Sequence, residues 1–258
     1  PQRARTVQGY IEAINAIASG ELQVGYVSKR LGVSTARALQ LLQPLRLEVR
    51  YLYNPELRSV WSVSASMMMF ILIMTAPLLA ALSVVREKET GSIYNIYAST
   101  IRRAEFILGK LLPNVLISFI NALVLWLMAM WYFGAPFKGN IPFFLLATLL
   151  YVLCTSSLGL LVSMLVRTQQ AALMIAVILS VIIALQFSGM LTPVSLLTGP
   201  NWLLAHLLPA MYYQNVVLGA FLKGSGWAVL WPEALVLAVY SAAVLGVVVL
   251  LFRKRTRT

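Results

Sequence analysis

The sequence is poor in the side chains that carry enzyme chemistry. Its 258 residues include one cysteine, Cys154, one histidine, His206, and no aspartate. No cluster of His, Cys and carboxylate residues has the spacing of a metal site, and a single cysteine cannot close a disulfide within the chain. We therefore expect no catalytic, cofactor-binding or metal-binding residues here, and we expect His206 to pack against its neighbours rather than to act as a ligand.

A phosphate-binding loop is also missing. Such a loop has the pattern G-x-x-x-x-G-K-[ST], in which glycines let the backbone surround the phosphates and a hydroxyl holds Mg²⁺. The nearest stretch, AEFILGKLL at 104–112, has Ala104 in place of the first glycine and Leu111 in place of the hydroxyl residue. The chain therefore does not bind ATP by this route.

Charged residues are scarce. They make up 11% of the chain, whereas about a quarter is usual in soluble domains, and hydrophobic residues make up 60%. A helix needs about 20 apolar residues to cross a bilayer, and five segments are long enough. We expect an all-α integral membrane protein with five transmembrane helices, at 60–85, 111–137, 141–166, 171–191 and 234–252.

These five segments contain no ionisable Asp, Glu, Lys, Arg or His. Ion-coupled transporters usually carry such groups within the membrane, because the coupling ion must be bound there. The neutral spans favour a membrane domain that is powered from outside its own spans. Backbone carbonyls can also bind ions, so an ion-coupled secondary transporter remains an alternative, which would lose transport when the proton gradient collapses.

The net charge of +12 is unevenly distributed over the connecting segments. Lysine and arginine in short loops mark the cytoplasmic side of a membrane protein. Two short loops hold only Lys138 and Lys223, so we assign them to the outer side, together with residues 1–59. This orientation predicts a multi-pass membrane protein with a cytoplasmic C-terminus. The residues assigned to the cytoplasm are Arg86, Lys88, Arg102, Arg103, Lys110, Arg167, Arg253, Lys254, Arg255 and Arg257.

Residues 192–230 are apolar but are broken by several prolines and glycines. One complete crossing here would put the basic C-terminal tail outside, against the charge rule. A pair of short re-entrant helices, at about 201–208 and 210–222, keeps the tail inside. Irregular backbone at membrane depth is tolerated where protein or water covers it, so we prefer the re-entrant pair.

Residues 1–59 have a different pattern. A helical apolar period covers 7–18, and LRLEVRYLYN at 45–54 alternates like a strand. We expect part of a small α/β extracytoplasmic domain, followed by the transmembrane domain at 60–258. Since the first residue is Pro1, we expect the chain to be part of a longer protein. The stretch 27–42 also resembles a helix-turn-helix, so a membrane-anchored DNA-binding regulator is an alternative, although the predicted topology puts this stretch outside and predicts no nucleic-acid partner.

The densest charge cluster lies in the predicted cytoplasmic loop 86–110, in the stretch REKETGSIYNIYAS. Its aromatic and aliphatic side chains suit a groove on a partner protein. A solvated connector with charges that reach the lipid headgroups is the alternative interpretation. Because this loop is the main cytoplasmic surface of the chain, we expect energy to enter there. The residues predicted to couple to an ATPase are Arg86, Glu87, Lys88, Glu89, Gly91, Ile93, Tyr94, Ile96 and Tyr97.

Four stretches in this order resemble the membrane subunit of ABC-2-type exporters: YNPELRS, ALSVVREKETGSI, AEFILGKLLP, and QFSGM followed by TP. The resemblance covers residues 45–252. The chain is similar in particular to the permease portion of the fused ribosome-associated ATPase and to related multidrug-type exporters. One departure is Ser99-Thr100-Ile101, where the family often has Thr-Pro after its coupling helix.

The resemblance implies six spans per subunit, so the five predicted here would be the family's second to sixth. It implies efflux across the bacterial inner membrane, a second permease half in a homodimer, and a fused or separate ATPase domain that binds ATP and Mg²⁺. The neutral spans favour a lipophilic or amphipathic small molecule as the cargo. The resemblance places 60–85 and 171–191 along the central pathway, although methionines there also suit packing or lipid contact. The candidate pathway residues are Met67, Phe70, Met74, Gln186, Phe187 and Met190.

Overall fold

A computed structural model describes residues 24–37, 59–192 and 194–252 of the chain. The chain divides into two compact units, 1–51 and 52–258, which are considered separately. Within the described residues every regular element is a helix. The predicted helix at 7–18 and strand at 45–54 lie outside these residues, so the α/β domain stays a prediction.

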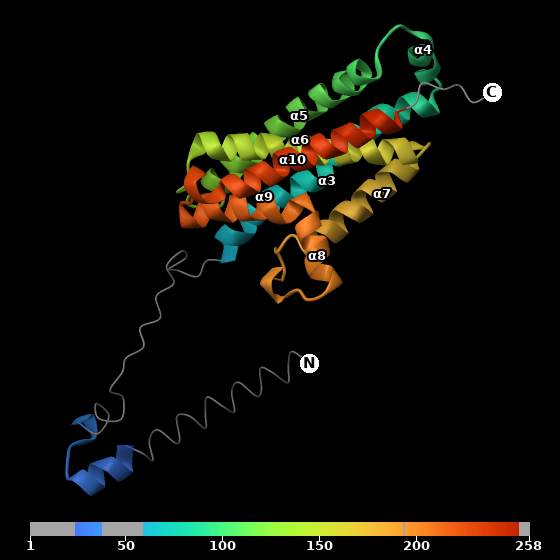
Figure 1. Cartoon of the computed structure of the whole chain (residues 1–258). Coiled ribbons are helices and arrows are strands. Elements are labelled where there is room, and N and C mark those ends of the chain that lie inside the picture. The colour runs from blue at the N-terminus through green and yellow to red at the C-terminus, as the bar shows by residue number, and fades with distance from the viewer. Residues whose placement is uncertain (1–23, 38–58, 193, 253–258) are drawn as a thin grey trace. The chain divides into compact units, whose positions relative to one another are not determined.

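Five long helices dominate the second unit, and each is long and apolar enough to cross a membrane. This confirms the predicted number of candidate spans. The fourth helix continues from Ile182 into a π-helical turn, Ile183–Phe187. The five helices, shown in Figure 1, are α3 (Ser59–Glu89), α5 (Arg103–Trp131), α6 (Ile141–Leu165), α7 (Gln169–Ile182) and α10 (Trp227–Leu251).

The helix bounds differ from the predicted apolar segments. Helix α3 continues to Glu89, and α5 begins at Arg103 rather than at residue 111. The N-terminus of α5 is closed by Glu105, whose Oε2 accepts a hydrogen bond from the Arg102 backbone N at 2.9 Å. Helix α10 begins at Trp227 and therefore contains Glu233. Backbone hydrogen bonding continues past the hydrocarbon-length window, so each of these helices adds a charged end to its charge-free segment. At its other end α5 stops at Trp131, so the predicted span residues 132–137 lie beyond the helix. The expected loop 86–110 shortens to residues 90–102.

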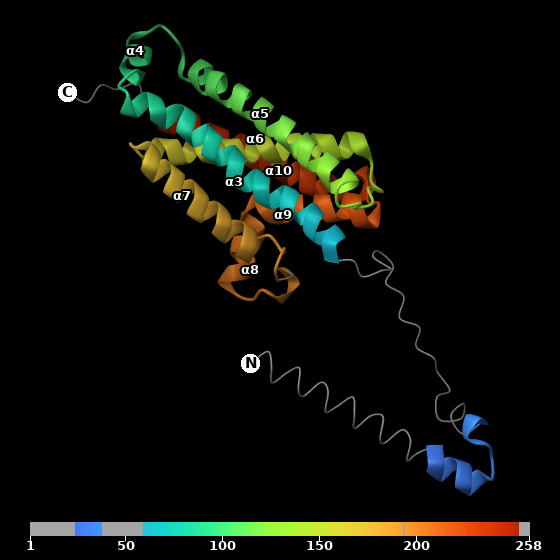
Figure 2. The ribbon, with the colours of Figure 1, turned by 180° about the vertical axis from the view of Figure 1, so that it is seen from behind.

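Helix α6 lies in the middle of the bundle, between α3 and α10 (Figures 1 and 2). It approaches α3 closely at Gly159. A Cβ atom at Gly159 would lie 2.1 Å from the carbonyl oxygen of Pro77 in α3. Small residues allow transmembrane helices to approach in this way. A glycine at this point therefore sets the spacing of the two central helices.

Two short helices occupy the Pro- and Gly-rich region, as expected. They are α8 (Pro200–Leu207) and α9 (Pro209–Leu218), and a π-helical turn, Gly219–Lys223, extends α9. Leu208 between them is extended, because the residue before a proline avoids the helical region. Helix α9 packs into the bundle: Tyr213 stacks on Tyr151 of α6 with ring centroids 4.0 Å apart. The re-entry of this pair into the membrane remains a prediction.

The described part of the first unit is short. Residues 24–31 form a helix, Gly32 has a φ of 62°, and residues 35–37 are helical again. Ser28 Oγ donates to the carbonyl oxygen of Val33 at 2.9 Å across the turn. The expected glycine turn is present, but the rest of the predicted second helix, 38–42, lies outside the described residues.

Candidate functional site

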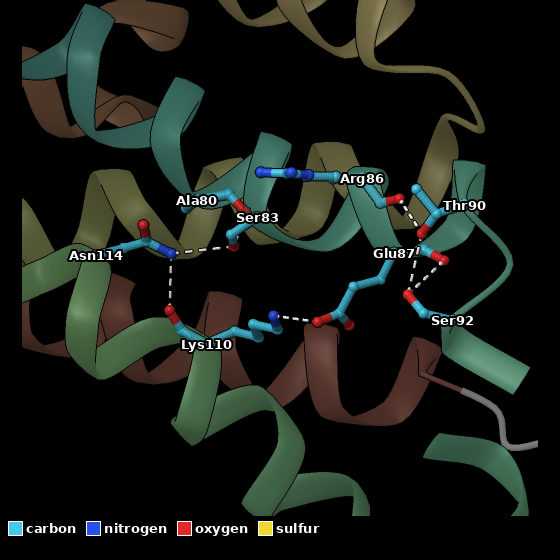
Figure 3. Close-up of polar contacts among 8 residues, drawn as sticks. All are labelled: Ala80, Ser83, Arg86, Glu87, Thr90, Ser92, Lys110 and Asn114. Atoms are coloured by element: carbon cyan, nitrogen blue, oxygen red, sulfur yellow. Dashed lines mark hydrogen bonds and ion pairs between the residues drawn. The ribbon is translucent and has the colours of Figure 1, made fainter. Parts of the chain in front are cut away.

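Helix α3 ends in a turn that reverses the chain into α4 (Ile93–Ala98). Gly91 has a φ of 78°, in the left-handed region that glycine adopts without a steric penalty. The backbone N and the Oγ1 of Thr90 both donate to the Arg86 carbonyl, at 3.0 and 2.9 Å, and Ser92 Oγ donates to the Glu87 carbonyl at 3.4 Å. Figure 3 shows these contacts. The exposed end of α3 is thus capped by the residues that lead into α4.

Helix α4 turns Ile93 inward and Tyr94 outward. Ile93 is only 4% exposed, whereas the adjacent Tyr94 is 61% exposed. Ile96 and Tyr97 belong to the same helix, but their side chains lie outside the described set. Ile93 therefore anchors α4 to the rest of the unit while Tyr94 presents an aromatic ring to the surroundings.

Polar contacts join α3 and α5 near the two helix ends that α4 connects. Lys110 of α5 forms an ion pair with Glu87, and both side chains are about three-quarters buried. One turn further into the bundle, Asn114 Nδ2 donates to Ser83 Oγ at 3.1 Å and to the Lys110 carbonyl at 2.7 Å (Figure 3). Desolvated charged and polar contacts of this kind fix two helices relative to each other. The two helices that α4 connects are therefore bound together directly.

The next two residues of α3 bind different helices. Lys88 Nζ donates to the carbonyl oxygens of Ser163 and, at 3.4 Å, Val166, at the end of α6. Glu89 Oε2 accepts from the backbone N of Gln169 at 3.3 Å and from its Nε2 at 2.6 Å, at the start of α7. Consecutive residues 87, 88 and 89 thus contact α5, α6 and α7 respectively.

The predicted coupling residues therefore fall into two groups. Glu87, Lys88 and Glu89 form contacts within the bundle, while the exposed Arg86 and Tyr94 face outward. The sequence alone did not indicate the partners of the inward group. The sequence did contain a signal for a polar contact between the two helices. In α3, Ser83 and Glu87 are four residues apart, and Lys110 and Asn114 of α5 have the same spacing. The partners are Lys110 for Glu87, the carbonyl oxygens of Ser163 and Val166 for Lys88, and Gln169 for Glu89.

The six predicted pathway residues differ in exposure. Met67 is 37% exposed and lines an apolar groove of about 390 Å³ between α3 and α5, together with Met68, Leu125 and Met128. Phe70 and Met190 pack against the main core, Met74 and Phe187 are half-buried, and Gln186 is exposed in the π-helical turn. The neighbouring Met68 and Met69 are almost fully buried. At these two positions the methionines pack in the core.

His206 makes contacts within α8. Its ring lies 4.1 Å from that of Trp202, and its Nδ1 is 2.8 Å from the Trp202 carbonyl oxygen. Among the described residues, no group of three His, Cys, Asp or Glu side chains is arranged to hold a metal ion. The side chain that the sequence singled out as a rare potential ligand therefore packs against its own helix.

A family model of ABC-2 family transporter proteins matches residues 2–250. The chain belongs to this family. Among similar proteins, the probable multidrug ABC transporter permease YbhR of Escherichia coli (strain K12) is 29% identical over 203 residues, which are 76% of this chain and 54% of YbhR. The inner membrane transport permease YhhJ of the same organism is 25% identical over 99% of this chain and 66% of YhhJ.

The chain is also similar to ABC transporter G family member 20 of Dictyostelium discoideum, with 28% identity over 72% of this chain and 25% of that protein. The chain spans about half to two thirds of the length of the bacterial relatives. No solved structure matches the chain.

Proposed function

We propose that this chain is the permease component of an ATP-driven exporter that moves lipophilic or amphipathic molecules out of the cytoplasm or the inner leaflet. Family membership and the names of the bacterial relatives support a transport permease. The sequence has no phosphate-binding loop, so ATP and Mg²⁺ bind in an ATPase domain, fused or separate. The spans carry neutral polar groups in their central parts, which suits a cargo that needs no charged partner in the membrane.

The observation that carries this proposal is the position of α4. It connects the ends of two spans that the Glu87–Lys110 ion pair binds together, and it exposes Tyr94 at this end of the bundle. Figures 1 and 2 both show α4 beyond the ends of α3 and α5. In the proposed topology this end faces the cytoplasm. Residues 91–99 then contact the ATPase, and residues 87–89 pass its movement to the spans.

The uncovered face of α7 supports a second permease half. Its exposed residues include Met174, Ile178 and Ile182, which are each about half exposed. Helices α5 and α10 are uncovered to a similar extent, whereas α3 and α6 are much more covered. A second copy covers the α7 face in the proposed homodimer. ATP binding closes the two ATPase domains, α4 moves with them, the spans of the two halves rock, and the cargo leaves between the halves along α3 and α7.

The test replaces the exposed ring on α4 by Tyr94→Ala in the complete protein. Co-purification with the ATPase and ATP-dependent efflux of a lipophilic dye are measured in membranes. We expect both to fall together, because interface aromatics carry a large part of binding energy. The control is Tyr132→Ala at the other end of α5, which removes a similarly exposed tyrosine. Unchanged co-purification and efflux in Tyr94→Ala would refute the role of α4.

A further inference from the structure

Two residues of α3 with opposite charges contact the turn between α6 and α7. Lys88 places its ammonium at the carbonyl end of α6, on the oxygens of Ser163 and Val166. Glu89 places its carboxylate at the amide end of α7, on Gln169. A helix has excess negative potential at its C-terminus and positive potential at its N-terminus. Two adjacent residues of α3 thus match the dipoles of two successive helices.

A separate apolar cluster lies beneath these charges. Its buried members are Ala81 and Val85 of α3, Val166 of the turn and Ala172 of α7, and it is distinct from the main core. Thr168 caps α7 by accepting a hydrogen bond from the Ala171 backbone N at 3.3 Å. The end of α3, the turn 166–168 and the first turn of α7 therefore share their own packing and their own polar contacts.

We infer that Lys88 and Glu89 are positioning residues that hold the end of α6 and the start of α7 to the end of α3, so that a movement of α4 is transmitted to α7. Helix α4 follows α3 after only three residues, Thr90 to Ser92, and two of these bind back to the last turn of α3. A displacement of α4 therefore acts on Lys88 and Glu89 directly. This inference rests on the proposed function for the source of the movement, while the contacts themselves are independent of it.

The route to α7 is distinct from the Glu87–Lys110 ion pair, which reaches α5. Further into the bundle, Ser180 Oγ of α7 donates to the Ile73 carbonyl of α3 at 2.6 Å. Helix α7 is thus attached to α3 near its start and again near its end. It moves with α3 as a unit as long as the Lys88 and Glu89 contacts persist.

The test measures a distance between α4 and α7. Cysteines are introduced at Ala98, the last residue of α4, and at Gln170, and both are labelled with nitroxides; both positions are exposed, and the native Cys154 is buried. The complete protein is reconstituted in lipid nanodiscs, and the distance distribution is recorded by pulsed electron paramagnetic resonance. In the labelled wild type we expect a narrow distance distribution. In Lys88→Met/Glu89→Ala its width is expected to roughly double, since each charge lost frees one helix end.

Two further variants separate positioning from a general effect of charge. Arg86→Met removes a charge from the same turn of α3 and is expected to leave the width unchanged. Lys88→Arg/Glu89→Gln retains a donor for the α6 carbonyls and an acceptor for Gln169, and is expected to restore most of the wild-type width. An unchanged width in Lys88→Met/Glu89→Ala, with the protein still eluting as a folded species, overturns the inference.

A second measurement separates this inference from the proposed function. The ATPase and a non-hydrolysable ATP analogue are added to the labelled wild type, and the distance is expected to shift; in Lys88→Met/Glu89→Ala the shift at α7 is expected to be lost. If the distance in the labelled wild type does not shift, the result contradicts ATP coupling through α4. A doubled width in the variant without nucleotide would still establish the positioning role.

Discussion

Asn114 of α5 donates a hydrogen bond to Ser83 of α3 at 3.1 Å, one turn from the ion pair between Lys110 and Glu87. The same amide nitrogen also donates to the Lys110 carbonyl of its own helix at 2.7 Å, which fixes its orientation. Further along, Asn121 Nδ2 lies 3.4 Å from Thr75 Oγ1. The α3–α5 interface thus combines a charged contact at the end of the bundle with neutral contacts deeper in the membrane, where charge is costly.

The first prediction concerns the ion pair. Lys110→Met leaves the Glu87 carboxylate partly buried without its charged partner, and the other oxygen of Glu87 already has no hydrogen-bond partner. We expect the free energy of unfolding to fall by about 1–3 kcal/mol, measured as a lower melting temperature in detergent. The swap Glu87→Lys/Lys110→Glu is expected to recover part of this loss. A swap as unstable as the single variant would contradict a pairwise interaction.

The second prediction concerns the crossing of the two central helices. In Gly159→Ala the new methyl group would lie 2.1 Å from the Pro77 carbonyl oxygen, so the helices must separate. We expect a loss of about 1–3 kcal/mol, as for other overpacked sites. The control is Gly246→Ala in α10, where a Cβ meets no atom within 4 Å. Equal melting temperatures for the two variants would show that this crossing tolerates expansion.

Features set by local sequence could be predicted, whereas features set by contacts between distant residues could not. Five spans and the two short helices near Pro209 followed from local hydropathy and from proline and glycine positions. The helix ends did not, because charged residues such as Glu89 and Lys110 continue a helix when they find partners on another one. Glu89 finds its partner 80 residues further along the chain, and no local pattern contains that information.

The same limit applies to the candidate site. The sequence identified 86–97 as a single cluster of charges and aromatics. The structure separates the inward-facing Glu87 and Lys88 from the outward-facing Tyr94, since their surroundings are formed by α5, α6 and α7. Which side of a charge cluster is buried depends on tertiary packing, and composition alone does not determine it.

The third prediction concerns topology. Lys29→Cys and Ala98→Cys each add one exposed thiol to a chain whose native Cys154 is buried. In spheroplasts a membrane-impermeant maleimide is expected to label the Lys29→Cys variant without permeabilisation and the Ala98→Cys variant only after it, because the basic short loops face the cytoplasm. The unmodified protein serves as the control for Cys154. The reverse labelling would place residues 24–37 in the cytoplasm and would favour the membrane-anchored regulator.

The last prediction concerns the turn between α3 and α4. Gly91 has a φ of 78°, and a side chain in this conformation costs about 1 kcal/mol. Because a Cβ there would meet only the Tyr94 ring, at 3.9 Å, Gly91→Ala strains the backbone without a severe clash. We expect a small fall in melting temperature but a clear fall in ATP-dependent efflux, since the reversal of the chain sets the direction of α4.

The matched control for Gly91→Ala is Gly109→Ala in α5, where glycine is helical and a Cβ has open space. Alanine favours a helix over glycine by about 1 kcal/mol, so this variant is expected to be as stable as the wild type or more so, with unchanged efflux. If both variants retained full efflux, the left-handed turn at Gly91 would matter only for folding. Loss of efflux in Gly91→Ala alone would instead tie transport to the direction in which α4 leaves α3.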